Sequence, residues 1–325
     1  MGVPVLVTLI VLLVAELAVR AVHSHLPVPS AWPSPELQKK YDQIESRVSS
    51  HQSTDVVLVG DSMMDAAGDP GALNADGVNQ SIYNASIAGE TLPTIAQWTM
   101  KVVVPRLHPK VVVIGLSSNE LNPASLDPAT GIAAYDASRA ARAASGTGSV
   151  VDNADAFLRK WSYLYRYRNS LRHPFGQPAT GVFNPTLTAT GRDLAFADKQ
   201  YLQYNTPAQA RQVVVGVIDA LAGFTVGPKN VAILQGLMTS LHSQGIQVLF
   251  VVMPVTADLV SFHPGGAPDY QKAVAAFISI AQHSDARIAI PGIWPTTQFA
   301  DPVHLNQAGT TEFSQYLAPL LRGAS

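Results

Sequence analysis

The stretch Asp55-Val-Val-Leu-Val-Gly-Asp-Ser62-Met-Met-Asp65 is the one around which the rest of the chain is organised. Its four aliphatic residues, bounded by Gly60, are typical of a short strand buried on both faces, as in a parallel sheet. Gly60 lets the backbone turn sharply, so Ser62 follows at the carboxyl end of the strand, where open α/β sheets hold their reactive groups. Serine and aspartate are also common in turns and helix N-caps, so this stretch alone leaves a capping role and a nucleophilic role for Ser62 open.

Composition limits the class of protein. Of 325 residues, 47% are hydrophobic and 14% are charged, which excludes a disordered chain and provides for a sizeable core. The formal net charge of −2 gives no basic surface, so we expect no nucleic-acid partner. With 0 cysteines, the chain has no disulfide, no thiolate metal ligand and no thiol nucleophile.

The N-terminus is apolar without interruption from Val3 to Ala15, and after Glu16 the apolar run resumes to Val19. This is near the lower limit of about 17 residues needed to span a bilayer. A cleaved signal peptide is the alternative, but the segment lacks an initial Lys or Arg and a good small-residue cleavage pattern. We therefore expect a single-pass membrane anchor over residues 1–22. Arg20 on the distal side leaves its orientation open.

Residues 23–54 are expected to form a Pro-rich linker, suited to holding a domain away from a membrane, and then a lead-in helix. Further predicted strands at 81–86, 111–115, 246–253 and 287–290 alternate with segments of helical periodicity. Strands that alternate with helices predict an α/β domain over 55–325, with a mostly parallel sheet covered on both faces. We read about 121–226 as an insertion in this domain, including a Gly/Pro/Thr-rich loop from 173 to about 192.

A second signal lies near the C-terminus, in Phe299-Ala-Asp301-Pro-Val-His304-Leu-Asn-Gln-Ala-Gly309. A serine nucleophile needs a base to take its proton, and the base needs a third group to fix its tautomer and stabilise the imidazolium. Asp301 and His304 can face each other on one tight turn, which leaves the second ring nitrogen to point towards Ser62. Because Asp-x-x-His is also common in surface turns, the pair gains weight only together with the first stretch.

Two further residues follow predicted strands. Gly89 comes after the second strand, where an unhindered backbone N–H can approach a substrate. Asn119 comes after the third strand, with a side-chain amide able to donate to a developing oxyanion. Either residue alone is more often a turn residue, but both are expected on the edge of the sheet that carries Ser62.

In this order, the four segments resemble the SGNH (GDSL-type) hydrolase superfamily, which is named for Ser, Gly, Asn and His. Residues 60–62 resemble the nucleophile block, 84–89 the glycine block, 115–119 the asparagine block and 301–304 the acid–base block. The resemblance covers residues from about 55 to 321. The family's asparagine block is usually Gly-x-Asn-Asp, whereas here three residues separate the Gly from Asn119 and Glu120 follows.

The resemblance implies a flavodoxin-like, three-layer α/β/α domain that transfers acyl groups through a serine ester. It implies Ser62 as nucleophile, His304 as general base and then acid, and Asp301 as the group that orients His304. The backbone N–H groups of Ser62 and Gly89 and the side chain of Asn119 would form the oxyanion hole. No metal or organic cofactor is implied.

The expected activity is hydrolysis of acyl esters of carbohydrates or lipids by an enzyme attached to the membrane, with its catalytic domain outside the cytoplasm. One alternative is an O-acyltransferase, with an acetyl donor or other membrane partner, acting on cell-surface polysaccharide, as in membrane-attached members of the family. Another is a catalytically silent scaffold for a membrane partner, against which the intact Ser62, Asp301 and His304 argue.

Three other features have competing interpretations. Asp61 is expected to shape the turn beside Ser62. His263 is kept as an alternative base. The basic and aromatic stretch from Arg159 to Arg168 could bind an anionic headgroup or glycan. The favoured interpretation of this stretch is an amphipathic helix that packs its aromatic residues and leaves its arginines in solvent.

Overall fold

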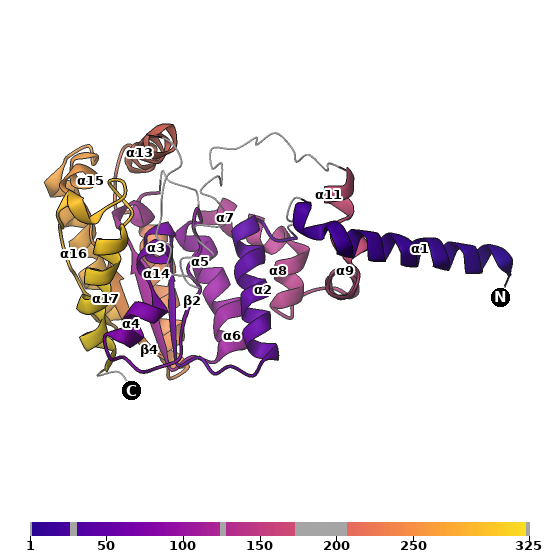
Figure 1. Cartoon of the computed structure of the whole chain (residues 1–325). Helices are drawn as coiled ribbons and strands as arrows, with labels where there is room; N and C mark the ends of the chain where they lie inside the picture. Colours follow the sequence, from indigo (N-terminus) through magenta and orange to yellow (C-terminus); the bar gives the residue numbers. More distant parts are fainter. Residues whose placement is uncertain (1, 27–30, 124–127, 173–206, 323–325) are drawn as a thin grey trace. The chain divides into compact units, whose positions relative to one another are not determined.

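The computed structural model describes residues 2–26, 31–123, 128–172 and 207–322 (Figure 1). By their internal contacts the residues divide into two compact units, one of Met1–Lys39 with Ala134–Gly181 and one of Lys40–Ala133 with Val182–Ser325. We refer to them as the anchor unit and the sheet unit. The loop expected from 173 to about 192 lies outside the described residues, and the domain limits drawn from the sequence stay predictions.

The sheet unit is built on five strands in the order β2-β1-β3-β4-β5. All four pairings between these strands are parallel. β1, β2 and β3 are buried along their whole length, which explains the apolar runs of β1 and β3. This strand order is the flavodoxin-like one, so the predicted α/β fold class is confirmed. The strands are β1 (Val56–Gly60), β2 (Ile82–Asn84), β3 (Val111–Leu116), β4 (Gln247–Val252) and β5 (Arg287–Ala289).

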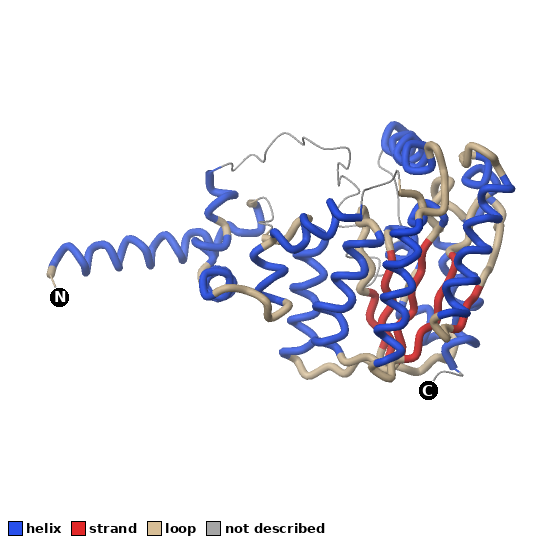
Figure 2. The backbone as a smooth tube through the Cα atoms, turned by 180° about the vertical axis from the view of Figure 1, so that it is seen from behind, coloured by secondary structure: helices blue, strands red, loops and turns tan. Residues whose placement is uncertain are grey.

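Helices cover both faces of this sheet (Figure 2). The chain moves from β1 to β2 in one direction and from β2 to β3, β4 and β5 in the other. Because crossovers between parallel strands are right-handed, the two directions place their helices on opposite faces. One layer holds α3 (Ser62–Ala67), α4 (Pro70–Ala75) and α17 (Gln307–Arg322), and the other holds α5 (Leu92–Trp98), α14 (Pro228–Ser243) and α16 (Ala267–His283).

The remaining segments of the sheet unit connect these layers. Between α5 and β3 the chain runs through a π-helical turn, η2. The connecting elements are η2 (Thr99–Val103), α6 (Val104–Leu107), η3 (Ser118–Leu121), α13 (Pro207–Leu221), α15 (Ala257–Ser261) and η4 (Thr296–Gln298). The core lies between the sheet and the helices, and it includes Met63 and Met64 of α3 beside Val303 and Leu305 near the C-terminus.

In the anchor unit, the apolar helix α1 (Val3–Val22) continues into η1 (His23–His25). Val3–His25 is long and apolar enough to cross a membrane, although a signal sequence would have the same length and composition. Most of its large apolar side chains are exposed, as expected for a helix outside a protein core. The other helices are α8 (Arg139–Ala144), α9 (Val150–Trp161), α10 (Tyr163–Arg166) and α11 (Arg168–Arg172), while α2 (Pro35–Ser49) and α7 (Pro128–Ala137) are each divided between the two units.

The interpretation favoured for residues 159–168 is wrong in two respects. Trp161 is 63% exposed instead of packed. Arg159, expected in solvent, has a side chain only 18% exposed and forms an ion pair with Asp155 at 2.6 Å. Periodicity shows which residues share a helix face but not which face is turned to the protein, and here buried carboxylates reverse the usual choice.

Candidate active site

Ser62 is the first residue of α3, directly after β1 and the turn at Gly60-Asp61. A Cβ on Gly60 would clash with the Gly115 carbonyl oxygen of the neighbouring strand and with Met64. Only glycine therefore lets β1 and α3 approach so closely. Ser62 is half-buried, and as the first residue of a helix its backbone N–H has no partner within that helix.

Asp301 and His304 lie on one turn between η4 and α17. One oxygen of Asp301, Oδ1, accepts hydrogen bonds from the backbone N–H groups of Val303 and His304, at 2.7 and 2.9 Å. The other, Oδ2, lies 2.8 Å from His304 Nδ1. Burial alone would raise the pKa of Asp301, but the charge of His304 and these hydrogen bonds hold it below its ordinary value. The carboxylate is therefore ionised at neutral pH.

The second ring nitrogen of His304, Nε2, lies 2.9 Å from Ser62 Oγ. Since Nδ1 faces a carboxylate, the proton of the neutral imidazole belongs on Nδ1, and Nε2 can accept the serine proton. His304 is 4% exposed and Asp301 is 8% exposed, so little water competes for these bonds. The three residues that the sequence predicted to act together form one hydrogen-bonded line.

The turns that carry Gly89 and Asn119 continue from the strands on either side of β1. After β2, Ile87 N donates to Gly60 O at 2.9 Å, so Gly89 and Ser62 each lie two residues beyond this bond. On the other side, Gly60 is in register with Gly115, and Asn119 follows four residues later in η3. Gly89 has φ +78°, a left-handed conformation that favours glycine. Both turns thus flank the end of β1.

Glu120, which in the sequence is only a departure from the family pattern, joins these two turns. Its Oε2 accepts from Leu92 N, just beyond the Gly89 turn, at 2.6 Å, and its Oε1 accepts from Asn119 Nδ2 at 3.1 Å. Ser117 Oγ donates to Asn119 Oδ1, so the amide of Asn119 is held at both ends. The Nδ2 atom has a second N–H that this clamp does not use.

Two carboxyl groups beside the candidate nucleophile are buried. Asp61 caps α3 by accepting from Met63 N at 2.8 Å, which confirms its expected role in the turn. Burial raises the pKa of Asp61 to about 6, against the opposing hydrogen bond from Met63 and the charge of His304. Burial raises the pKa of Glu120 to about 8, and the charge of Asp61 adds to this rise.

Two residues to which sequence reasoning gave no role in the site, Lys40 and Asn84, support α3. Lys40 of α2 is 3% exposed and donates to Asp65 Oδ1 at 2.8 Å and to Asn84 O at 3.0 Å. Asn84 Nδ2 donates to the Gly68 carbonyl at the end of α3 at 2.8 Å. A lysine in a polar helix gives no sequence signal of burial, although Asn84 does begin the predicted glycine block.

His263 is not the base that serves Ser62. Its Nε2 lies 2.9 Å from Ser118 Oγ, and its Nδ1 faces the backbone carbonyls of Leu259 and Val260. His263 is 2% exposed and Ser118 is 1% exposed. This second histidine–serine pair is sealed in the core behind the Asn119 turn. As for a metal, the described parts of the chain contain no group of three or more His, Asp or Glu that could hold one.

Neither a family model nor a curated protein matches the chain. Solved structures resemble it at 12% identity. A Streptococcus pneumonia protein named for platelet activating factor has a TM-score of 0.42 and covers 88% of this chain and 92% of its own. An inhibitor-bound M. smegmatis aryl esterase has a TM-score of 0.36, with 84% and 100% covered. A carbohydrate acetylesterase family member from Sinorhizobium meliloti also has a TM-score of 0.36, with 83% and 99% covered.

Two of these three proteins are esterases by name. At such TM-scores and identities, the superpositions carry no argument about activity. The chemistry of this chain has to follow from its own residues.

Proposed function

We propose that this protein is a serine ester hydrolase, with Ser62 as nucleophile, His304 as general base and acid, and Asp301 as the residue that orients His304. The observation that carries the proposal is the line from Asp301 Oδ2 to His304 Nδ1 at 2.8 Å and from His304 Nε2 to Ser62 Oγ at 2.9 Å. A nucleophile, a base and an orienting carboxylate in this geometry are what acyl transfer through serine requires.

In the proposed reaction, Ser62 Oγ attacks the carbonyl carbon of an ester while its proton passes to His304 Nε2. The carbonyl oxygen becomes an oxyanion that accepts hydrogen bonds from the N–H groups of Ser62 and Gly89 and from Asn119 Nδ2. Collapse of this intermediate expels the alcohol, which takes the proton from His304. Water, deprotonated by His304, then attacks the acyl-serine, and Ser62 and the free acid are regenerated.

The substrates that we propose are acyl esters of carbohydrates or lipids, reached from a membrane-anchored position outside the cytoplasm. The apolar helix α1 supports the anchor, since its length and exposed apolar surface suit a bilayer. An O-acyltransferase would use the same acyl-serine and differ only in that a sugar hydroxyl replaces water. An assay with and without an added sugar acceptor therefore separates the two reactions.

The test is active-site labelling of the full chain, purified in detergent, with a fluorophosphonate that reacts with activated serines. We expect one modified residue, Ser62, found by mass spectrometry of the digested protein, together with loss of p-nitrophenyl ester hydrolysis. Prior incubation with excess short-chain ester should slow the labelling. An unlabelled Ser62, with hydrolysis no faster than in Ser62→Ala, would overturn the proposal and leave a silent scaffold as the better account.

A further inference from the structure

The helix α9 in the anchor unit turns its apolar side chains outward and its carboxylates towards the protein. Its exposed residues are apolar, with Val150 86%, Phe157 62% and Trp161 63% exposed. Its carboxylates face the protein instead, since the Asp152 and Asp155 side chains are only 5% and 7% exposed. At 3.6 residues per turn, Val150, Val151, Ala154, Phe157, Leu158 and Trp161 fall on about a third of the helix circumference.

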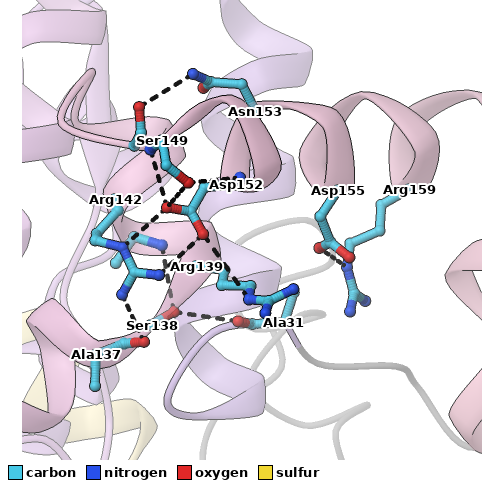
Figure 3. Close-up of polar contacts among 12 residues, drawn as sticks. Ala31, Ala137, Ser138, Arg139, Arg142, Ser149, Asp152, Asn153, Asp155 and Arg159 are labelled. Atoms are coloured by element: carbon cyan, nitrogen blue, oxygen red, sulfur yellow. Dashed lines mark hydrogen bonds and ion pairs between the residues drawn. The ribbon is translucent and has the colours of Figure 1, made fainter.

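The inward carboxylates hold α9 in this orientation (Figure 3). Asp152 accepts from Arg142 Nη2 at 2.9 Å and, through a capping box, from Ser149 N at 3.0 Å. The Arg142 and Ser149 hydrogen bonds hold the pKa of Asp152 well below its ordinary value. The pairing with Arg142 of α8 would be lost if the helix turned its apolar face inward, so this contact holds the apolar face outward.

Asp155 makes a second set of contacts one turn further along α9. It pairs with Arg159 at 2.6 Å and with Arg168 at 3.0 Å, and it accepts from Tyr165 Oη at 2.6 Å. Burial alone would raise the pKa of Asp155, but the hydrogen bonds from Tyr165 and Arg159 lower it. Both carboxylates are thus paired on the protein side of α9. The exposed polar residues beside the apolar face are Asn153 and Lys160.

The unit that presents this face is joined directly to α1. Glu16 of α1 accepts from Ser162 Oγ and from the backbone N–H groups of Tyr163 and Leu164 at the start of α10, at 2.8, 2.8 and 2.9 Å. Glu16 precedes the last residue of α1 by six positions, which is about 9 Å along a helix. With the end of α1 at the membrane surface, this contact would lie within the depth of about 5–10 Å to which interfacial helices bury their apolar faces.

The direction of α9 suits the same surface. In Figures 1 and 2, α9 is seen end-on where α1 is seen from the side, so α9 runs across α1 instead of along it. If α1 crosses a bilayer, α9 therefore lies along the membrane plane. Phe157 and Trp161, whose ring centroids are 6.3 Å apart, are the aromatic residues expected at such a boundary.

We propose that α9 is an interfacial helix, which lies in the surface of the membrane crossed by α1 with its apolar face against lipid acyl chains. The proposal rests on the membrane anchor and not on ester hydrolysis. The anchor unit is thereby held to the bilayer by both α1 and α9.

The first test is a spin-label measurement on the full chain in phosphatidylcholine vesicles. Because the chain has no cysteine, Phe157→Cys, Trp161→Cys and the border control Asn153→Cys each carry a single label. We expect labels at 157 and 161 to collide several-fold more with oxygen, which partitions into lipid, than with a water-soluble nickel chelate. The label at 153 should favour nickel. Nickel preference at all three positions would overturn the proposal, and so would low collision with both reagents at 157 and 161, because a protein surface would then cover the face.

A second measurement needs no label and leaves the fold unchanged. Brominated phosphatidylcholine quenches tryptophan within the bilayer, and comparison of the wild type with Trp161→Phe isolates one of the four tryptophans. Quenching that falls in Trp161→Phe supports the proposal, whereas equal quenching contradicts it. Ester hydrolysis is assayed on the same vesicles, and we expect Trp161→Phe to retain it. A failed interfacial contact is thus distinguished from a failed enzyme.

Discussion

Two buried histidines, His304 and His263, each hold a serine hydroxyl 2.9 Å from Nε2, yet only one is equipped for catalysis. Behind His304, the Asp301 carboxylate lies 2.8 Å from Nδ1. Behind His263 are the backbone carbonyls of Leu259 and Val260, at 3.2 and 3.3 Å. A carbonyl can fix the tautomer of a histidine, but it has no charge with which to stabilise the imidazolium that forms when the serine proton arrives.

The two serines differ as well. Ser62 is half-buried at the end of β1, whereas Ser118 is 1% exposed within η3. The rings of Phe224 and Tyr270 pack edge-on against His263, and burial lowers the pKa of His263 below its ordinary value. A histidine–serine hydrogen bond is therefore not sufficient to identify an active site. A charged third group and access to the serine decide it.

Removal of each serine in turn is expected to show the largest difference between the two pairs. Ser62→Ala and His304→Ala should each lower kcat/KM for p-nitrophenyl esters by about 10⁵-fold, because either change removes the whole acyl-transfer unit. Ser118→Ala is the matched control, since it removes the same hydroxyl from the other pair, and it should stay within a few-fold of wild type. A large loss in Ser118→Ala, with Ser62→Ala still active, would exchange the two assignments.

The third group is tested by Asp301→Asn. This change keeps the size of the side chain but removes its charge, and an amide can donate to Nδ1 and so favour the wrong tautomer. We expect kcat to fall by about 10³–10⁴-fold with little change in KM, because the charge acts mainly in the transition state. The fall in kcat is measured by assays of ester hydrolysis with two esters, one with a slow and one with a fast leaving group. A fall of less than tenfold would show that a carbonyl-like partner suffices, and the contrast with His263 would lose its meaning.

The sequence predicted much of this site because its physical signals are local. Solid aliphatic runs identify buried parallel strands, and Gly60-Asp61-Ser62 and Asp301-Pro-Val-His304 each bring their groups together within one turn. Contacts that depend on side chains distant in sequence gave no such signal. The buried ion pair between Lys40 and Asp65 links residues 25 positions apart, and both read as surface charges.

The packing of α9 and the role of Glu120 were missed for physical reasons of the same kind. Amphipathic spacing marked a face of α9, but buried pairing of Asp152 and Asp155 with arginines turns the charged face inward. Similarly, Glu120 looked like an irregularity of the asparagine block. Its carboxyl holds the two turns together only because the backbone N–H of Leu92, 28 residues earlier in the chain, donates to it.

The oxyanion side of the comparison is tested by Asn119→Ala. Asn119 directly follows the sealed Ser118, yet its amide nitrogen is the group that we propose to face the reaction. Loss of one oxyanion donor typically costs about 10²–10³-fold in kcat. We expect a fall of this size with KM nearly unchanged, measured with the same esters. An unchanged kcat would remove Asn119 from the proposed oxyanion hole while leaving Ser62 and His304 in place.

A smaller effect is expected from Glu120→Gln. Both partners of the Glu120 carboxyl are N–H donors, so an amide can satisfy only one of them, and its own N–H₂ faces the other. The Asn119 amide should then be less well oriented, with about a tenfold fall in kcat. In Asn119→Ala the same Glu120→Gln change should have little further effect on kcat. An equal loss in both backgrounds would mean that Glu120 acts through the fold and not through Asn119.

The smallest effect concerns the stability of the sealed pair, tested by His263→Gln. The ordinary pKa of 6.5 applies in the unfolded chain, while burial lowers the pKa of His263 in the folded protein, against the opposing Leu259 and Val260 carbonyls and the charge of Asp269. The unfolded chain therefore takes up the proton first. The contribution of neutral His263 is present above pH 6.5 and is lost as the pH falls through the folded pKa.

Glutamine can still hydrogen-bond to Ser118, but it does not titrate. We therefore expect the wild type to have the higher Tm at about pH 7 and its advantage over His263→Gln to shrink towards about pH 5, as followed by circular dichroism. The buried acids Asp61 and Glu120 are present in both proteins, so their own pH dependence cancels in the difference. A constant Tm difference over this range would mean that His263 does not change its protonation on unfolding. The distinction between a sealed histidine and a working one would then rest on Asp301 alone.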